Sequence, residues 1–180
     1  MAAGRRGFET VADMARSMGV VLAVVAVVVL ITIRTKGEVI RLVDVAGTYT
    51  QAKIGGTPFP LLRPVGLSDA WRATSVYFNP PEVTGVPGVT LWHIGYVTPA
   101  NQYAGMEQTN GLASDALQAA VTGPSPVGSI PVAGVTWQQF SGDGGTRRAL
   151  VHTAGTVTVV VDGTAPWTEL EELAGSLSAT

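Results

Sequence analysis

The stretch from Ser17 to Ile33 constrains this chain most, because it is long and contains no charged residue. As an α-helix that rises about 1.5 Å per residue, it would be about 25 Å long, close to the ~30 Å hydrocarbon core of a bilayer. Apolar runs that form buried strands in soluble domains are shorter, about 4 to 8 residues. The sequence therefore predicts a transmembrane helix over residues 17–33, with the lipid bilayer as its partner.

Charged residues on the two sides of this run bear on its orientation. Arg34 and Lys36 stand where a signal peptidase would need small residues, so we expect an uncleaved signal anchor. Basic residues lie on both sides of the run, and the positive-inside rule therefore does not decide the topology. From the usual behaviour of short-tailed anchors, we expect a single-pass protein of the cell membrane with a cytoplasmic tail over residues 1–16 and a C-terminal domain outside.

Composition limits what the rest of the chain can do. The chain has 180 residues and no cysteine, so disulfides and thiolate chemistry are excluded. Residues 1–36 carry a net charge of +3, and the remainder carries −5. A mildly acidic domain without a basic face is poorly suited to binding phosphate backbones, and we expect no nucleic-acid partner.

Residues 34–70 are interpreted as a juxtamembrane connector followed by a proline-rich strap. Apolar positions between Val39 and Val45 are consistent with either a short helix or an edge strand. Further along, Pro58, Pro60 and Pro64 hold the chain extended and remove backbone donors. Such a segment is typical of a strap laid over a domain.

Residues 71–180 show strand patterns followed by helix patterns, twice over. Residues 89–98, VTLWHIGYVT, place Trp92 and Ile94 on one face and His93 on the other, which is typical of a central strand. Helical apolar spacing follows over residues 111–121 and again after Pro166. The order predicts an α+β extracytoplasmic domain, βββα-βββα, with a mostly antiparallel sheet and two packed helices.

Signals for catalysis and metal binding are weak. His93 and His152 lie within predicted strands, where a histidine usually donates to a backbone carbonyl, and they show no metal-ligand spacing. No G-x-S-x-G motif is present, and the glycine-rich SGDGGTRR segment precedes a predicted strand, which favours a hairpin loop over a phosphate cradle. We expect no catalytic residue, no metal and no cofactor. The alternative is an envelope hydrolase that uses His93 or His152 as its base.

The four tryptophans are expected in the core, and the alternative is that aromatic residues line a groove between the helices and the sheet for an apolar or carbohydrate ligand.

Three motifs together resemble a known family. They are the strap PFPLLRPVGL followed by Trp71, Arg72, Thr74 and Ser75; the segment HIGYVTP; and the paired Gln102-Tyr103 and Glu107-Gln108-Thr109. With the preceding apolar span, this resembles the actinobacterial membrane family of domain of unknown function 4245. The resemblance implies an envelope protein with one anchor and one external domain, and it brings no catalytic residue with it.

The function expected from these observations is binding or interaction by a membrane-anchored extracytoplasmic domain, with an envelope or membrane protein as partner. The candidate surface is the tip of the predicted hairpin, at Thr98, Asn101, Gln102 and Tyr103, because binding residues gather on loops held by a rigid sheet. A third alternative is an accessory subunit of a larger membrane complex, held mainly through the span.

Overall fold

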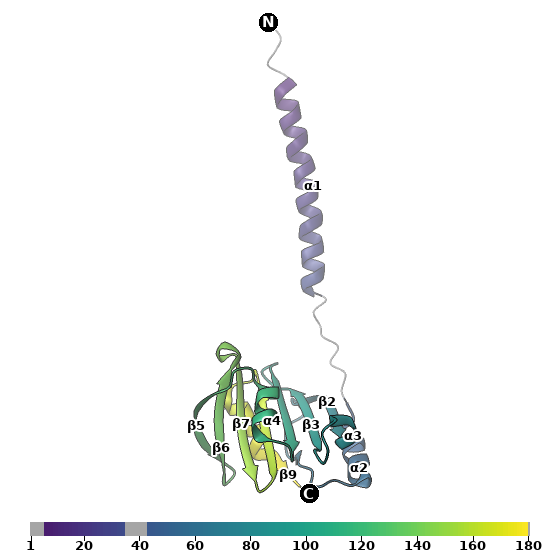
Figure 1. Cartoon of the computed structure of the whole chain (residues 1–180). Coiled ribbons are helices and arrows are strands. Elements are labelled where there is room, and N and C mark those ends of the chain that lie inside the picture. The colour runs from purple at the N-terminus through teal and green to yellow at the C-terminus, as the bar shows by residue number, and fades with distance from the viewer. Residues whose placement is uncertain (1–5, 35–42, 180) are drawn as a thin grey trace. The chain divides into compact units, whose positions relative to one another are not determined.

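A computed structural model describes residues 6–34 and 43–179 of the chain (Figure 1). Two compact units are distinguished, Met1–Val39 and Ile40–Thr180. The second unit includes the connector beyond residue 39 and the proline-rich strap, which the sequence had placed ahead of a domain beginning at Trp71. Part of the predicted connector, residues 35–42, lies outside the described residues.

The first unit contains one long helix, α1 (Arg6–Arg34). Within it, Asp13–Leu30 has a mean hydropathy of 2.1, and none of these residues is buried by other parts of the protein. The helix is therefore long and apolar enough to cross a membrane. It begins before the predicted span and ends at Arg34, next to the predicted boundary.

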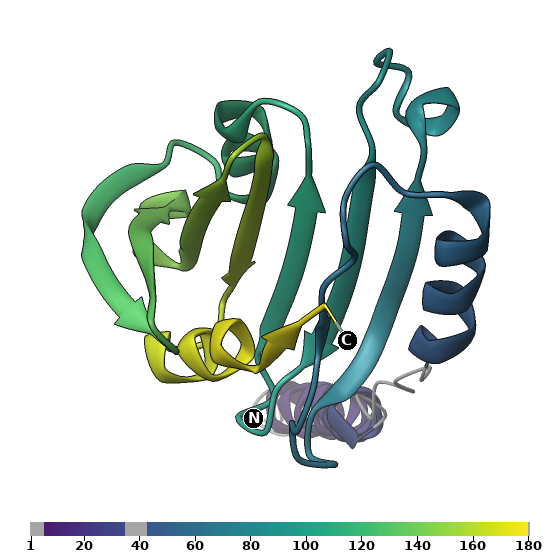
Figure 2. The same ribbon diagram turned by 90° about the horizontal axis from the view of Figure 1, so that it is seen from below.

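The second unit is built on one seven-stranded sheet whose order is β2-β3-β4-β8-β7-β6-β5, with every neighbouring pair antiparallel (Figure 2). The strands are β2 (Arg72–Asn79), β3 (Leu91–Val97), β4 (Tyr103–Thr109), β5 (Ser125–Val132), β6 (Val135–Gly142), β7 (Arg147–Ala154) and β8 (Val157–Gly163). A separate two-stranded pairing joins β1 (Arg63–Pro64) to β9 (Leu177–Ser178). The predicted α+β class and antiparallel sheet are confirmed.

One strand of the seven-stranded sheet was missed by the predicted βββα-βββα order. β5 adds a fourth strand to the second repeat, which makes its order ββββα. Pro126 and Pro131 interrupt its sequence pattern, and the register shifts between Pro126 and Gly128. Prolines are tolerated because β5 is an edge strand and most of its residues are exposed.

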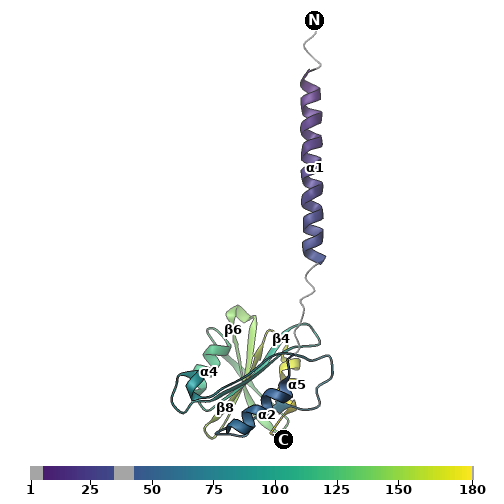
Figure 3. The ribbon, with the colours of Figure 1, turned by 90° about the vertical axis from the view of Figure 1, so that its right-hand side faces the viewer.

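Five helical segments accompany the sheet: α2 (Val45–Gly55), α3 (Pro81–Thr84), α4 (Ala113–Ala120), the short η1 (Asp143–Gly145) and α5 (Trp167–Ser176). A helix, α2, begins at the last of the apolar positions between Val39 and Val45, and residues 39–42 of that pattern lie outside the described residues. Asp44 caps α2 by accepting a hydrogen bond from the Gly47 backbone N–H at 2.9 Å. The two predicted helices appear as α4 and α5, and they cover opposite faces of the sheet (Figure 3).

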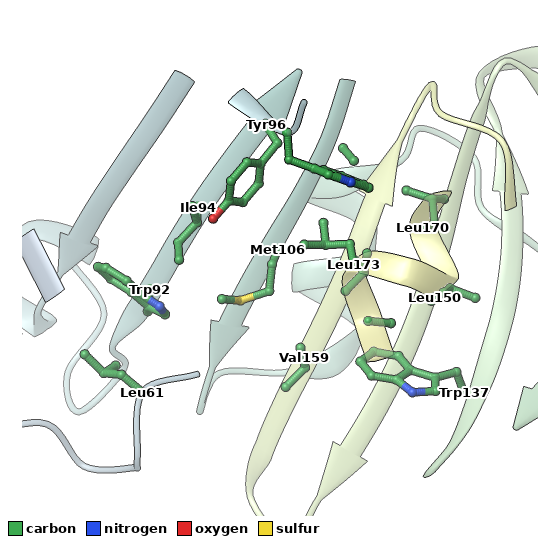
Figure 4. Packing of buried hydrophobic residues seen from close by; sticks show 14 of the residues in the cluster. Leu61, Trp92, Ile94, Tyr96, Met106, Trp137, Leu150, Val159, Leu170 and Leu173 are labelled. Carbon is green, nitrogen blue, oxygen red and sulfur yellow. The ribbon is translucent and has the colours of Figure 1, made fainter. Parts of the chain in front are cut away.

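One face of the sheet carries the main hydrophobic core, which we call the core face (Figure 4). Its side chains pack against α2, α5 and the strap. The central residues of this core are fully buried: Trp92, Ile94, Met106, Leu150 and Val161 of the sheet, and Leu170 and Leu173 of α5. Three of the four tryptophans are buried in this core, as predicted, and Trp167 is partly buried against it.

Polar groups on the core face hold the strap in place. The Trp92 indole Nε1 donates to the Leu62 carbonyl at 2.8 Å. The Gln108 side-chain amide accepts from the Leu62 N–H and donates to the Pro60 carbonyl, both at 2.9 Å. These three bonds satisfy backbone groups of the strap that lie against the core.

The opposite face is only partly covered. α4 packs on β7 and β8, where Ala116 and Val121 meet Ala149, Val151 and Val160. Over β2, β3 and β4, the side chains on this side are mostly polar. This half of the sheet contains the candidate site.

Candidate ligand-binding site

Seven polar side chains lie together on the α4 side of the sheet, and we call this group the polar face. They are Ser75 and Tyr77 of β2, His93 of β3, Tyr103 and Glu107 of β4, Arg147 of β7 and Asp162 of β8. Alternate residues of a strand point to opposite faces, so these positions alternate with the core-face residues. The register places Tyr77 opposite His93, and His93 opposite Glu107.

His93 is at the centre of this group. Its ring stacks on Tyr77 with centroids 4.5 Å apart, and Nε2 lies 3.2 Å from the Ser75 hydroxyl and 3.4 Å from the Tyr103 hydroxyl. Burial lowers the pKa of His93 to about 4, so the ring is neutral at physiological pH. Its Nδ1 is buried and has no hydrogen-bond partner among the described residues.

A hydrogen bond to a backbone carbonyl was predicted for both histidines, and only His152 makes it within the described part of the chain. His152 Nδ1 donates to the Thr136 carbonyl at 3.1 Å, as expected for a structural histidine. For His93 the prediction was wrong, because its contacts are to hydroxyl groups on neighbouring strands. Sequence alone could not supply these partners, which depend on strand register.

Two glycines make room for the Tyr103 ring on the sheet. Gly95 and Gly105 are directly paired across β3 and β4. A Cβ at Gly95 would collide with the Ser75 hydroxyl, and one at Gly105 would lie 2.5 Å from the Tyr103 hydroxyl. The absence of both side chains lets Tyr103 reach His93 across the strand surface.

Arg147 and Asp162 form a charged pair beside this ring. Arg147 Nη2 donates to Asp162 Oδ2 at 2.6 Å, and the guanidinium lies 5.6 Å from the Tyr103 ring centroid. Burial raises the pKa of Asp162, and the neighbouring guanidinium only partly offsets this. Arg147 and Arg148 are consecutive in β7 and therefore lie on opposite faces of the sheet, and Arg148 donates to the carbonyls of Thr164 and Ala165.

A cavity of about 300 Å³ adjoins the polar face, between β3, β4, α4 and the loop before β3. Its apolar lining comes from Val86, Val89, Leu91, Leu112, Ala116 and Ala119. Its acidic lining comes from Glu107 and Asp115. The volume is at the lower end of the range for small-molecule sites, and the mixture of apolar lining and few polar groups is typical of them.

Glu107 connects the cavity to the polar face. Its burial, together with the nearby Asp162 carboxylate, raises its pKa to about 7. Among residues 6–34 and 43–179, no group donates a hydrogen bond to its carboxyl or forms an ion pair with it. A half-buried carboxyl is normally compensated by a donor, and a ligand in the cavity would supply one to Glu107.

The four residues predicted at the hairpin tip do not form a single exposed patch. Thr98 is fully buried, and its hydroxyl accepts from the Gln102 N–H at 3.2 Å. Asn101 is exposed with a φ of 54°, and its side-chain oxygen accepts from Arg72 at 2.8 Å. Tyr103 points away from the tip into the polar face. Asn101 and Gln102 remain the exposed part of that surface.

Sequence reasoning missed Ser75, Tyr77, Glu107, Arg147 and Asp162 as site residues. One signal was available in the sequence, because Glu107 is a charged residue in the middle of a strand. In the structure its neighbours Met106 and Gln108 are buried. A charged residue in the middle of a central strand costs free energy unless it is compensated, and it is therefore a candidate for function.

Comparison with known proteins gives one family. The model of the family described as "Protein of unknown function (DUF4245)" matches residues 6–177, which includes α1 and all strands of the sheet. No curated protein matches the chain.

Proposed function

The chain belongs to the DUF4245 family, and we propose that it is a membrane-anchored, extracytoplasmic domain of the cell envelope that binds a small ligand in the cavity beside Glu107 and catalyses no reaction. The observation that carries this proposal is a half-buried carboxyl without a donor in a cavity of about 300 Å³. A bound ligand would supply the missing donor. Small-molecule sites typically combine apolar surface with a few polar groups, and the polar groups fix the orientation of the ligand.

Binding is favoured over catalysis by the state of the polar face. His93 is neutral, and its Nε2 lies between two hydroxyl groups. A catalytic histidine is usually oriented through Nδ1 by a carboxylate or carbonyl, and the described residues offer His93 Nδ1 no such group. Glu107 is better placed than His93 to act as an acid or base, because it lines the cavity. Most of the other side chains that line the cavity are apolar.

The helix α1 supports the anchored part of the proposal. Its apolar side chains are exposed along Asp13–Leu30, and a bilayer would cover them. In the orientation we propose, the tail is cytoplasmic and the sheet domain is outside. Tethering raises the effective concentration of the domain toward its neighbours in the membrane, so a weak contact at Asn101 and Gln102 with an envelope or membrane protein would suffice.

The ligand proposal is tested by blocking the cavity. Ala119 lines the cavity on an exposed side of α4, and Ala119→Trp would fill its mouth. Gln118→Trp is the matched control, since Gln118 is exposed on the same helix and does not line the cavity. Native mass spectrometry of the full chain, extracted from its own membrane, should show a bound small molecule on the wild type and Gln118→Trp, and none on Ala119→Trp. Equal occupancy in all three, or none in the wild type, would contradict the proposal.

A hydrolase is the second candidate, and one contact favours it: the Ser75 hydroxyl lies 3.2 Å from His93 Nε2. A fluorophosphonate reagent labels serines that are activated by a base. Labelling of the wild type that disappears in both Ser75→Ala and His93→Gln would establish the hydrolase. Under our proposal Ser75 stays unlabelled, and His152→Gln changes nothing.

The accessory-subunit alternative predicts a different result when the span is replaced. If the span alone carried the function, replacing residues 17–33 by an unrelated transmembrane helix would abolish it. We expect the cellular phenotype to survive that replacement and to be lost in Ala119→Trp.

A further inference from the structure

We infer that the cavity binds a small amphipathic monocation, an apolar amine whose ammonium group pairs with Glu107 while its hydrocarbon part lies against the apolar lining. This inference depends on the proposed function, because it assumes that the cavity is a ligand site. It adds the chemical class of the ligand and the residue that recognises it.

The apolar part of the ligand is indicated by the lining. Val86 and Val89 come from the loop before β3, and Leu112 and Ala119 come from the α4 side, so aliphatic surface faces the cavity from two directions. Leu112 is 69% exposed and Val86 is 51% exposed. Burying such surface against a hydrocarbon group is favourable in proportion to the area removed from water.

The charge of the ligand is indicated by the titratable groups around the cavity. Glu107 and Asp115 both line it, and none of the basic residues in the described part of the chain does. On the polar face, Asp162 is the next carboxylate, and Arg147 already donates to it at 2.6 Å. His93, the direct cross-strand neighbour of Glu107, is neutral because burial lowers its pKa to about 4. Tyr77 and Tyr103 keep their protons because burial raises the pKa of both.

The resulting field favours a cation. An anionic ligand would face two carboxylates without a compensating base, and a neutral ligand would give Glu107 one hydrogen bond but no opposite charge. An ammonium group supplies several donors together with the charge that a half-buried carboxylate lacks. Ion pairs of this kind gain strength where water is partly excluded.

A linked proton release follows from the same geometry. In the protein without ligand, the pKa of Glu107 lies near 7, so part of the population has a protonated Glu107 at neutral pH. A bound ammonium favours the ionised carboxylate, and binding therefore displaces the proton. The affinity for the amine should rise as the pH increases through the range in which Glu107 titrates.

The test uses three probes that share a phenyl group on a short chain: phenethylamine, phenethyl alcohol and phenylacetate. Binding is measured by isothermal titration calorimetry on the full chain in phosphatidylcholine nanodiscs, with empty nanodiscs subtracted. Glu107→Gln removes the proposed charge, and Glu82→Gln is the matched control, because Glu82 is exposed on α3 and does not line the cavity.

We expect the wild type and Glu82→Gln to bind phenethylamine equally, and Glu107→Gln to bind it at least tenfold more weakly. Phenethyl alcohol should bind more weakly than the amine and should be indifferent to Glu107→Gln. Phenylacetate should not bind. Raising the pH from 6 to 8 should strengthen amine binding severalfold in the wild type and leave it unchanged in Glu107→Gln.

The inference is overturned if the alcohol binds as tightly as the amine, or if Glu107→Gln binds the amine as the wild type does. In either case the proposed function is decided separately, by occupancy in the Ala119→Trp experiment. If none of the three probes binds, the inference is also overturned, and occupancy in the Ala119→Trp experiment then decides the proposed function separately.

Discussion

The two faces of the same sheet are built from alternate residues of the same strands, and they differ in almost every physical respect. On the core face, Trp92 and Ile94 are fully buried beneath the strap and helices. On the polar face, His93 lies between them in sequence and contacts hydroxyl groups, and Glu107 borders a cavity. The core face stabilises the fold, and the polar face retains ionisable groups, among which Glu107 has no donor in the described part of the chain to offset its burial.

This difference indicates where function lies. Every fully buried aliphatic or aromatic side chain contributes free energy to folding, while a half-buried carboxyl without a donor costs it. Such a cost is expected where a site is arranged for a ligand rather than for stability. Four substitutions, ordered from the largest expected effect to the smallest, test whether the two faces differ in this way.

Trp92→Ala should have the largest effect. It removes a fully buried ring and the indole donor to the Leu62 carbonyl, so the free energy of unfolding should fall by about 4 kcal/mol. The neighbouring His93→Ala, on the opposite face, should cost about 1 kcal/mol, the value of a modest hydrogen-bonded contact. Urea unfolding of both variants measures the contrast, and equal losses would show that the two faces contribute alike.

Arg147→Ala should come next. Asp162 is 5% exposed, so the substitution leaves a buried carboxylate without its partner and should cost about 3 kcal/mol. The double variant Arg147→Met, Asp162→Leu removes both charges and should recover stability to within about 1 kcal/mol of the wild type. A double variant as unstable as Arg147→Ala would mean that packing, not charge, explains the loss.

Glu107→Gln should stabilise the protein at high pH. The folded-state pKa of about 7 lies above the usual value of 4.5, so the folded state binds the proton more tightly, and the wild type loses stability as the pH rises between these values. The shift corresponds to roughly 3 kcal/mol. Because the Gln amide is also half-buried, we expect a gain of about 2 kcal/mol at pH 8. Near pH 4 the gain should vanish.

Thermal or urea unfolding across this pH range measures the effect of Glu107→Gln, with Glu82→Gln as an exposed control. His93 titrates in both wild type and variant, and its contribution therefore largely cancels in the difference. A difference that does not change with pH would contradict the raised pKa of Glu107.

Gly105→Ala should have the smallest effect on stability, about 1 kcal/mol, because the new Cβ displaces the movable end of the Tyr103 side chain rather than backbone. Once Tyr103 moves, His93 becomes more hydrated, and its pKa should rise from about 4 toward the usual 6.5. Histidine titration by NMR measures this shift. An unchanged pKa would show that Tyr103 does not shield His93.

The sequence predicted the parts of this fold that depend on local periodicity. The alternation in VTLWHIGYVT placed Trp92 and Ile94 opposite His93, and the proline-rich segment was interpreted as a strap. The pattern of β5 failed because Pro126 and Pro131 resemble loop residues, and only its edge position makes them acceptable.

The site was less accessible from sequence. Glu107, His93 and Tyr77 are neighbours only through the register of three strands, and Asp162 joins them from a strand that is distant in sequence. The hairpin tip was predicted as a binding loop, but Thr98 is buried within the turn. Local patterns do not give the register of paired strands or the pairing of strands that are distant in sequence, so the polar face could not be assembled from them.

The central claim is that the Glu107 carboxyl binds a ligand in the cavity. The most direct test is to titrate this carboxyl with and without an amine. The carboxyl carbon of Glu107, assigned by comparison with Glu107→Gln, is followed by NMR against pH. We predict a midpoint near pH 7 in the free protein that moves downward when phenethylamine is present. A midpoint near the usual value of 4.5, or one that phenethylamine does not move, would contradict the claim.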